Sequence, residues 1–273
     1  MSLTILNNMS AIAAENQLNI TSAEMNSTLE QLSSGSRINS GADDPAGLAI
    51  ADGLQANVAA LTQSGSNATD GVGELQVADG ALSQVTTLLD RAVTLATEAA
   101  NGGLSTAQST ALTGEYTAIQ NEITNIGANT NYNGAQVFTA NAVNVYLTDG
   151  TTSGSTTISA TPGALTLGSL NLTASNLGTT TSAQTQLGQI TSAIATVAAT
   201  RGSLGASVEE LQAASNVMTV QTQNLTSAEN NITAADIPSA VANLSQYSIL
   251  EQTGISALSQ ANQQQQLVLK LLQ

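Results

Sequence analysis

The chain has 273 residues and carries 19 acidic against 4 basic side chains, a formal net charge of −15, with no His and no Cys. This excess of negative charge argues against nucleic acid and against insertion into or binding to anionic membranes, because both present negative charge of their own. The lack of His and Cys excludes disulfides and thiol nucleophiles, and it removes the usual general base and most zinc ligands.

The first expected element is a helix over residues 1–33. No Lys or Arg occurs in residues 1–17 and the apolar runs there are short, so this stretch is not typical of a secretory signal peptide. Nor does any window reach the ~18 consecutive apolar residues that a membrane helix needs. Apolar or small residues recur in steps of three and four, which is one face of a helix: Ala11, Ala14, Leu18, Ser22, Met25, Leu29 and Leu32.

A connector over residues 33–44 follows this helix. It is rich in Ser and Gly, and Asp44-Pro45 reads as the start of the next helix, with Asp44 as N-cap and Pro at the first helical position. Arg37 and Asn39 share this loop with the adjacent carboxylates of Asp43 and Asp44. We expect Arg37 to pair with Asp43 or Asp44 and to fix the angle between two helical layers. The plain alternative is an ordinary surface turn.

The second helix is expected over residues 45–100 and carries a heptad pattern. At 1.5 Å per residue it would be about 80 Å long, which favours a rod or a bundle. Asn101-Gly102-Gly103 should end it. The expected contact stripe is Ile50, Leu54, Val58, Leu61, Gly65, Ala68, Val72, Leu75, Asp79, Leu82, Thr86, Leu89, Val93 and Ala96.

A third helix should begin at a capping box, Ser105-Thr-Ala-Gln108, and close at the turn-rich residues 129–134. Residues 138–181 then change character. Val143, Val145 and Leu147 alternate with polar residues, and Thr156–Ala160 and Leu165–Leu172 are short and rich in Thr or Leu. This predicts two or three short strands, in a piece too small to form a separate core.

A fourth helix is expected from a second capping-box candidate, Thr181-Ser-Ala-Gln184, and a final helix from the break at Asp236-Ile-Pro238 to the C-terminus. The fourth helix has a stripe whose steps are all three or four: Ile190, Ile194, Val197, Arg201, Leu204, Val208, Leu211, Ser215, Met218, Thr222, Leu225, Glu229 and Ile232. Each long helix has one apolar stripe that needs cover, so the two halves of the chain should pair.

The predicted fold is therefore mainly α, with long antiparallel heptad helices in a rod-like bundle and a small β-hairpin insert. The predicted domains are a terminal-helix domain (1–44 and 235–273), a helical rod (45–137 and 182–234) and the insert (138–181). The terminal helices have stripes with little else in the chain to cover them, so we expect self-association. The assembly residues expected from these stripes are Leu18, Met25, Leu29, Leu244, Leu250, Leu258, Leu269 and Leu272.

Catalytic chemistry has little support in the sequence. Lys270 is the only Lys and lies in an apolar tail, which argues against a Ser–Lys nucleophile. Glu209-Glu210 reads as a solvated helix face, and no cluster of carboxylates around a Gly turn suggests calcium. We therefore expect no enzyme, no cofactor and no metal.

Several motifs, in order along both halves of the chain, resemble bacterial flagellin. The N-terminal ones are Leu-Ser-Ser-Gly-Ser-Arg-Ile-Asn-Ser at 32–40, Asp-Asp-x-Ala-Gly at 43–47, Thr-Gln at 62–63, Asn-Ala-x-Asp-Gly at 67–71 and Asn-x-Asn-Gly at 131–134. The C-terminal ones are Asn-Leu-Thr-Ser-Ala-Glu at 224–229, Ile-Leu-x-Gln-x-Gly at 249–254 and Ala-Leu-x-Gln-Ala-Asn-Gln at 257–263. The resemblance covers roughly residues 1–138 and 182–273.

The resemblance implies a subunit of the flagellar filament, a homopolymer for swimming motility, in which the terminal helices form an inner coiled coil. It implies a secreted, extracellular location reached through the flagellar type III export apparatus. It also implies a flagellin chaperone and the cap and junction proteins as partners. Recognition by a vertebrate Toll-like receptor is implied through the positions that align as Arg91, Leu95 and Glu115.

Two alternatives remain open at this point. A hook–filament junction protein shares the mirrored ends, and Asp43-Asp44-Pro45 is slightly closer to such proteins. A coiled-coil signalling or adhesion module is a different class, which would form a monomer or dimer and no fibre.

Overall fold

The computed structural model describes residues 8–151, 153–173 and 176–271, with side chains to residue 267. The elements in these ranges are α1 (Met9–Ser34), α2 (Pro45–Ala99), α3 (Thr106–Asn129), β1 (Asn131–Tyr132), β2 (Ala135–Gln136), β3 (Val143–Leu147), β4 (Thr156–Ala160), α4 (Thr180–Thr233) and α5 (Ile237–Leu271). The mainly α fold with a small β insert is therefore as predicted. The chain divides into two compact units, one of residues 1–55 with 225–273 and one of residues 56–224. This division falls inside α2 and α4, whereas the predicted domain limits fall at the helix breaks.

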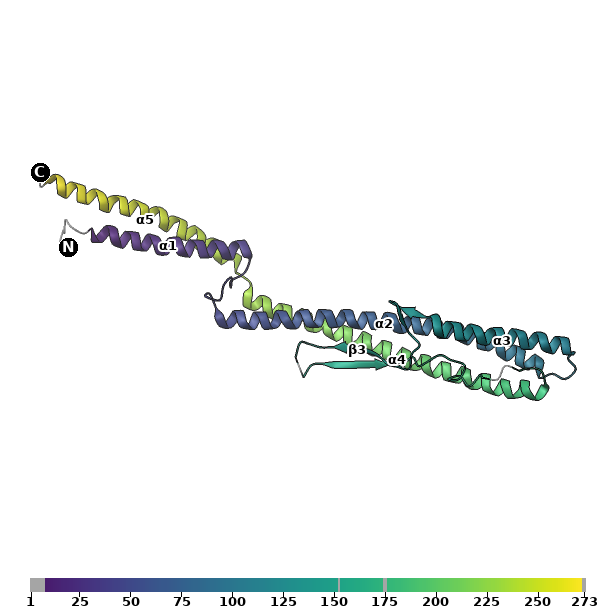
Figure 1. The fold of residues 1–273 in the computed structure, drawn as a ribbon. Coiled ribbons are helices and arrows are strands. Elements are labelled where there is room, and N and C mark those ends of the chain that lie inside the picture. Colours follow the sequence, from purple (N-terminus) through teal and green to yellow (C-terminus); the bar gives the residue numbers. More distant parts are fainter. Residues whose placement is uncertain (1–7, 152, 174–175, 272–273) are drawn as a thin grey trace. The chain divides into compact units, whose positions relative to one another are not determined.

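In the unit of residues 56–224, α2, α3 and α4 run side by side (Figure 1). The buried stripe of α2 advances in steps of three and four, as a heptad pattern requires. Its residues are Leu61, Ser64, Ala68, Gly71, Leu75, Ala78, Leu82, Val85, Leu89, Ala92, Ala96 and Ala99. The predicted and buried stripes share Leu61, Ala68, Leu75, Leu82, Leu89 and Ala96. Between these, the prediction chose the residue directly after the buried one, at Gly65, Val72, Asp79, Thr86 and Val93. The buried residues at these intervening positions are mostly Ala and Gly. Small residues let helices approach closely, so the size of a side chain did not identify the buried position there.

Helix α4 contributes a large side chain to the core at every seventh residue, as its stripe predicted. These residues are Ile190, Val197, Leu204, Leu211 and Met218. Its start differs from the prediction: the hydroxyl of Thr179 accepts from the Ser182 N–H at 3.1 Å, two residues before the expected Thr181–Gln184 box. A Thr-Thr-Thr run offers three possible caps, and the sequence alone does not rank them.

The predicted capping box of α3 is confirmed. The Ser105 hydroxyl accepts from the Gln108 N–H, and the Gln108 side chain accepts from the Ser105 N–H at 2.9 Å. At the other end of α3 the expected turn forms a tight hairpin of β1 and β2 around Asn133-Gly134. Both residues have positive φ, 49° and 82°, which a two-residue type I′ hairpin turn requires.

Strands β3 and β4 pair antiparallel, with Val145 opposite Ile158, and both of these side chains are buried. The Cα of Gly71 faces Val145 so closely that a side chain at position 71 would collide with it. The hydroxyl of Ser64 donates to the Thr148 carbonyl at 2.9 Å. The hairpin therefore lies on α2 and has no core of its own, as its length predicted.

Of the two or three strands predicted for residues 138–181, the described residues form two. The candidate Leu165–Leu172 consists of turns and irregular backbone. It follows α3, where the carbonyl of Leu165 lies against Gly127 and the Gln120 side chain donates to the Leu172 carbonyl at 2.7 Å. Leu165, Leu170 and Leu172 are buried. Hydrogen bonds within the stretch and the one from Gln120 satisfy backbone groups here, so the leucines cover the helix without a partner strand.

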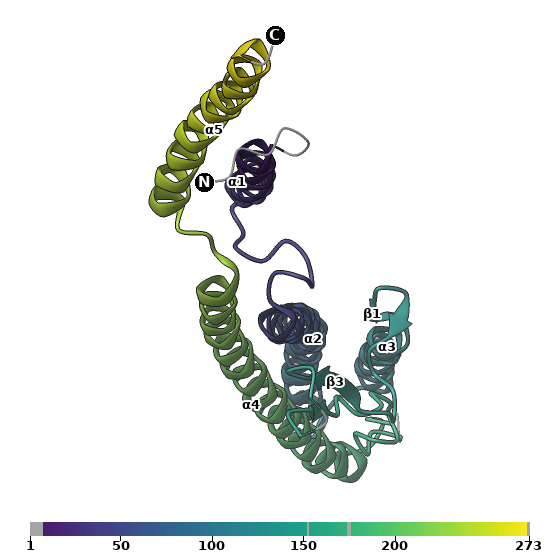
Figure 2. The ribbon, with the colours of Figure 1, turned by 90° about the vertical axis from the view of Figure 1, so that its left-hand side faces the viewer.

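In the other unit, α1 and α5 lie side by side (Figures 1 and 2). The Asn8 side chain caps α1 by accepting from the Ala11 N–H at 3.0 Å, and its amide donates to the Ala261 carbonyl of α5 at 3.1 Å. α1 ends at Gly35, whose φ of 71° is the left-handed conformation common after helices. Among the described residues, no helix is long and apolar enough to cross a membrane.

Candidate assembly interface

The fully buried positions in the contact between α1 and α5 hold small and polar residues. Thr21 and Thr28 are buried, and each hydroxyl donates to a carbonyl of its own helix, at 2.9 and 2.8 Å. On α5, Ala240 is buried, and a Cβ at Gly254 would lie 3.3 Å from the Leu18 side chain. The terminal helices thus partly cover each other, which agrees with the expectation that the chain offers little cover for their stripes. The cover is partial, because the fully buried side chains are small and the larger Leu18, Met25 and Leu244 are only half-buried.

The large apolar side chains of these helices are exposed instead. Ile20 is 56% exposed and Ile249 is 62% exposed. The full set is Met9, Ile12, Ile20, Leu29, Ile237, Val241, Ile249, Leu250, Ile255 and Leu267, and we call it the outer apolar set. A run of exposed large apolar residues on both helices is typical of a surface that another protein covers.

The predicted assembly residues divide between the two sides of this pair. Leu18, Met25, Leu244 and Leu258 are half-buried, and Leu29 and Leu250 belong to the outer apolar set. The side chain of Leu269 and the whole of Leu272 lie outside the described residues. The isoleucines of the outer apolar set were not predicted, because they lie off the single stripe expected on each helix. Large apolar residues off that stripe were the signal in the sequence.

In the connector, Asp44 acts as the predicted N-cap of α2, since its carboxylate accepts from the Gly47 N–H at 2.9 Å. Asp43 accepts from the N–H groups of Asn39 and Ser40 at 2.9 and 2.8 Å. These hydrogen bonds favour the carboxylate form and hold the pKa of Asp43 below its ordinary value.

The predicted ion pair of Arg37 with Asp43 or Asp44 is wrong. The Arg37 guanidinium donates to the Ile232 carbonyl at the end of α4, at 2.7 Å. Both carboxylates already accept from backbone N–H groups nearby in the sequence, which cost little chain entropy to bring together. Asn39 stays within the loop, and its amide donates to the Ser36 carbonyl at 3.2 Å.

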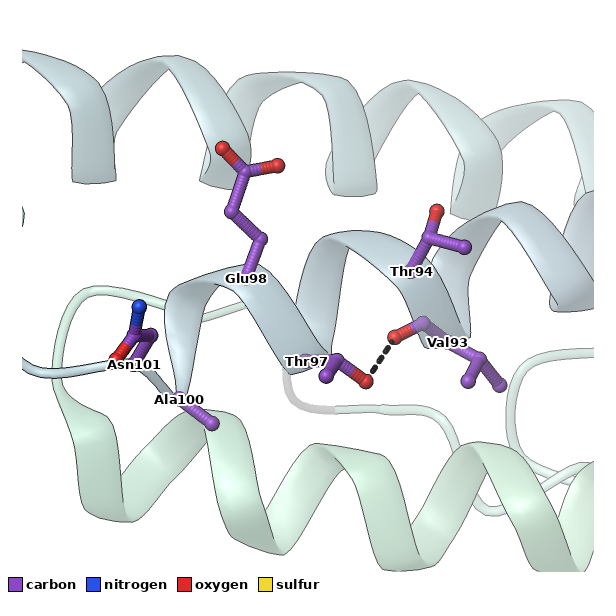
Figure 3. Close-up of a pocket in the computed structure, with 6 residues that line it drawn as sticks. All are labelled: Val93, Thr94, Thr97, Glu98, Ala100 and Asn101. Carbon is purple, nitrogen blue, oxygen red and sulfur yellow. Dashed lines mark hydrogen bonds between the residues drawn. The ribbon is translucent and has the colours of Figure 1, made fainter.

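The three residues aligned with receptor-contact positions differ in solvent exposure: two are exposed and one is buried. Arg91 and Glu115 form an ion pair at 2.7 Å between α2 and α3, with side chains 56% and 45% exposed. Leu95 is only 1% exposed and belongs to the core. The nearby surface at the end of α2 forms an open hollow of about 650 Å³ (Figure 3). Its lining residues, among them Thr94, Thr97 and Glu98, all come from the end of one helix or its first following residues, so no polar groups converge there from several elements.

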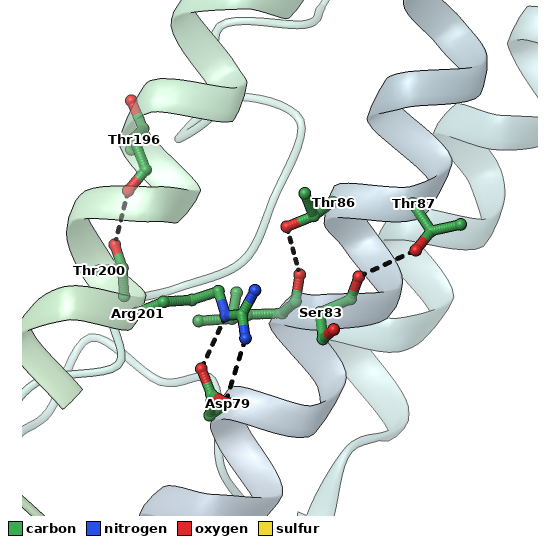
Figure 4. Close-up of polar contacts among 8 residues, drawn as sticks. Asp79, Ser83, Thr86, Thr87, Thr196, Thr200 and Arg201 are labelled. Carbon is green, nitrogen blue, oxygen red and sulfur yellow. Dashed lines mark hydrogen bonds and ion pairs between the residues drawn. The ribbon is translucent and has the colours of Figure 1, made fainter. Parts of the chain in front are cut away.

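A second ion pair joins the two long helices of the same unit. Arg201 of α4 donates to both carboxylate oxygens of Asp79 on α2, at 2.7 and 3.3 Å (Figure 4). Both residues stood in the predicted stripes, and both lie at the edge of the core, partly exposed. The two long helices therefore pair with each other, as the predicted stripes required. Among the described residues, no group of three or more acidic side chains could hold a metal ion.

The bacterial flagellin N-terminal helical region matches residues 5–143, and the bacterial flagellin C-terminal helical region matches residues 187–272. The chain belongs to the bacterial flagellin family. As a flagellin it is a structural subunit of the flagellar filament.

Similar flagellins include short chains of matching length. The flagellin of Halalkalibacterium halodurans is 31% identical over 271 residues, covering 99% of this chain and 100% of that one. The flagellar filament 30.7 kDa core protein of Treponema maltophilum is 28% identical over 284 residues, with 99% and 100% coverage. Flagellin E of Vibrio cholerae is 37% identical over 154 residues, 56% of this chain and 41% of that one. The crystal structure of Bacillus cereus flagellin matches with a TM-score of 0.50 and 28% identity, over 60% of this chain and 94% of that one. These relatives lend no support to the junction-protein alternative.

Proposed function

We propose that the outer apolar set of α1 and α5 is the surface through which copies of this chain join into the filament. The observation that carries the proposal is the distribution of side chains. Thr21, Thr28 and Ala240 fill the contact within the chain, whereas Ile20 and Ile249 point away from it and are more than half exposed. A helix pair that keeps its large residues outside leaves most of its apolar area for a neighbour.

Charge cannot drive this association. The only charged side chains in residues 240–273 are Glu251 and Lys270. The only ones in residues 1–33 are Glu15, Glu24 and Glu30. Apolar burial supplies about 25 cal/mol for each Å² removed from water, so a set of ten large side chains can outweigh the repulsion between subunits of net charge −15. The repulsion itself is screened by salt within about 10 Å at 0.1 M.

Order in these helices should rise on polymerisation. An isolated helix of this length is marginal in water without packing, and the small contact between α1 and α5 adds little. We infer that α1 and α5 are weakly stable in the monomer and gain their full helical order from neighbouring copies.

The test replaces outer residues and leaves the inner contact intact. Ile20→Asn combined with Ile249→Asn should abolish elongation from filament seeds, because two desolvated polar amides would replace apolar contacts. Asn19→Ser is the matched control, an exposed polar residue beside Ile20, and should elongate normally. Sedimentation and electron microscopy measure elongation, and circular dichroism verifies folding. Normal elongation of the double variant would refute the proposal.

The finer partners follow from family membership and also stand as proposals. We infer that the chain leaves the cell through the flagellar type III export apparatus with a flagellin chaperone. We also infer that it meets the cap and junction proteins at the filament ends. Co-purification of the chain with a flagellin chaperone, and its presence in sheared extracellular filaments, test these inferences.

Recognition of the monomer by a vertebrate Toll-like receptor is a second candidate function. The observation that favours it is the exposed Arg91–Glu115 pair, which lies at two of the three aligned positions. Leu95 is buried, so its contribution would be to support α2 from the core. Arg91→Ala should lower receptor activation in a reporter-cell assay of folded monomer. Glu122→Ala, an exposed acid on α3, is the control and should leave it unchanged.

A further inference from the structure

The C-terminal end of α4 receives hydrogen bonds from the N-terminal connector. The Ile232 carbonyl accepts from the Arg37 guanidinium at 2.7 Å. The Thr233 carbonyl accepts from the Arg37 N–H at 2.6 Å and from the Ser36 hydroxyl at 3.0 Å. The last carbonyls of a helix have no partner within it, so three donors from a segment 195 positions away satisfy groups that would otherwise face water.

The same connector segment also hydrogen-bonds to the backbone just after the end of α4. The Ala235 N–H donates to the Gly35 carbonyl at 3.0 Å, and Ser36 pairs with Ala234 in an isolated antiparallel bridge. We call Gly35–Arg37 the connector cap. Its positive charge lies at the negative end of the α4 dipole, which strengthens the bond of Arg37.

These bonds compete with an uninterrupted helix. In a continuous helix the Ile232 and Thr233 carbonyls would accept from the N–H groups four residues later, those of Asp236 and Ile237. The Ala235 N–H would bond back to α4 in the same way. A carbonyl can accept two hydrogen bonds, but the single Ala235 N–H donates to Gly35 and not to α4, so the chain at this point has two alternative hydrogen-bond patterns.

Pro238 does not by itself decide between the two patterns. It lacks the N–H that would bond the Ala234 carbonyl, and it disfavours the helical conformation of Ile237. Proline inside a helix often produces a kink with the helix continuing on both sides. A kinked continuous helix is therefore the alternative that the connector cap must exclude.

We propose that the connector cap keeps α4 and α5 as two helices, so that order in the N-terminal connector determines the conformation of the junction between α4 and α5. Arg37 is the positioning residue, because it alone supplies both a backbone donor and a charged donor to the end of α4. When the cap is displaced, the Ala235 N–H loses its partner and the junction opens. When Pro238 is replaced as well, the freed carbonyls accept from the following turn and α4 continues into α5. The inference does not depend on the proposed assembly surface.

The test is a set of four full-length proteins: the wild type, Ser36→Ala with Arg37→Ala, Pro238→Ala, and the triple variant. Backbone chemical shifts and amide exchange of residues 232–238 report the junction. The wild type and Pro238→Ala should both keep the break, because the cap is intact. The cap variant should exchange the Ala235 amide about ten-fold faster. The triple variant should be helical through residues 232–238.

Two results would overturn the inference. One is a continuous helix in Pro238→Ala alone, which would mean that proline sets the break. The other is an unchanged exchange rate at Ala235 in the cap variant. Arg37→Lys keeps the charge and a donor and should restore most of the protection, which a loss of general stability would not do. Arg91→Ala removes an arginine elsewhere and should leave the junction unchanged. None of these measurements requires filaments, so failure of assembly and failure of this inference are distinguishable.

Discussion

The two compact units of this flagellin distribute their large side chains in opposite ways. In residues 56–224, Leu75, Leu89 and Leu211 are fully buried between helices of the same chain. In the terminal helices the buried positions hold Thr21 and Thr28, and isoleucines of comparable size to those leucines are exposed. Both regions have the same heptad-like spacing. The spacing therefore shows that a helix makes contacts, and the size of the residues on each face shows whether the main contact lies within the chain or outside it.

This difference separates stability from assembly. A unit that buries its leucines internally can hold its fold as a monomer. A helix pair whose fully buried residues are threonines and an alanine, and whose leucines are only half-buried, gains less free energy on pairing, because less apolar surface leaves water. The terminal helices are thus suited to obtain most of their stabilisation from other copies.

The largest expected effect comes from deleting a core leucine. Leu211→Ala should lower the free energy of unfolding of the monomer by about 2–5 kcal/mol, through lost apolar burial and a residual cavity. Thr28→Ala, in the contact between α1 and α5, removes a hydroxyl bonded to its own helix and one methyl group, and should change monomer stability by only about 1 kcal/mol. Urea denaturation followed by circular dichroism measures both. Equal losses in the two variants would show that the units are stabilised alike.

Much of this fold could be predicted from the sequence. The helices, the breaks at the connector and before Pro238, and the capping box at Ser105 follow from local chemistry that acts over a few residues. The sequence left open whether Leu165–Leu172 is a strand, because an apolar run has the same appearance whether it pairs with a strand or lies along a helix. Every second residue of the predicted α2 stripe between Leu61 and Ala96 was placed one residue too late. Ala and Gly contribute little to an apolar pattern, although they lie at the closest helix contacts.

The candidate site was less predictable. The Asp44 cap follows from an adjacent Pro and a nearby N–H, so it could be found locally. The partner of Arg37 could not, because the Ile232 carbonyl is 195 positions away and backbone acceptors leave no mark in the sequence. Leu95 is absent from the predicted stripe and is buried beside the buried Ala96.

Helix caps in the two units provide a second test of the comparison. Ser105→Ala removes the cap of α3 and should cost the unit of residues 56–224 about 1 kcal/mol. Asp44→Ala removes a similar cap at the start of α2, in the unit that contains the terminal helices. If that unit obtains its order from neighbouring copies, Asp44→Ala should scarcely change monomer unfolding but should lower filament melting temperature. Calorimetry of the monomer and of the filament measures both effects. A loss of about 1 kcal/mol in the monomer stability of both Ser105→Ala and Asp44→Ala would contradict this expectation.

The two ion pairs of residues 56–224 should have smaller effects. Asp79–Arg201 and Arg91–Glu115 are both substantially exposed, so a double-mutant cycle on either should give a coupling of about 0.2–1 kcal/mol. Asp79–Arg201 uses both carboxylate oxygens and joins the two long helices, so we expect the larger coupling there. Couplings should shrink in 1 M salt. A coupling of several kcal/mol for either pair would mean that charge, rather than apolar burial, organises this unit.

The smallest expected effect is a difference in pH response between the units. Burial raises the pKa of Glu74 above its ordinary value of 4.5, whereas backbone hydrogen bonds lower the pKa of Asp43 below its ordinary value of 3.8. A raised carboxyl pKa means that the folded state binds more protons than the unfolded state, so the penalty from Glu74 is absent below pH 4.5 and grows as pH rises through the folded pKa. Asp43 has the opposite sign, and its contribution is present above pH 3.8 and lost as pH falls through the folded pKa. Glu74→Gln should therefore raise the melting temperature at pH 7 and leave it unchanged below pH 4, as thermal denaturation across that range would show. A gain that is the same at every pH would mean that the substitution acts through packing, because only the charged form of Glu74 incurs the cost of desolvation.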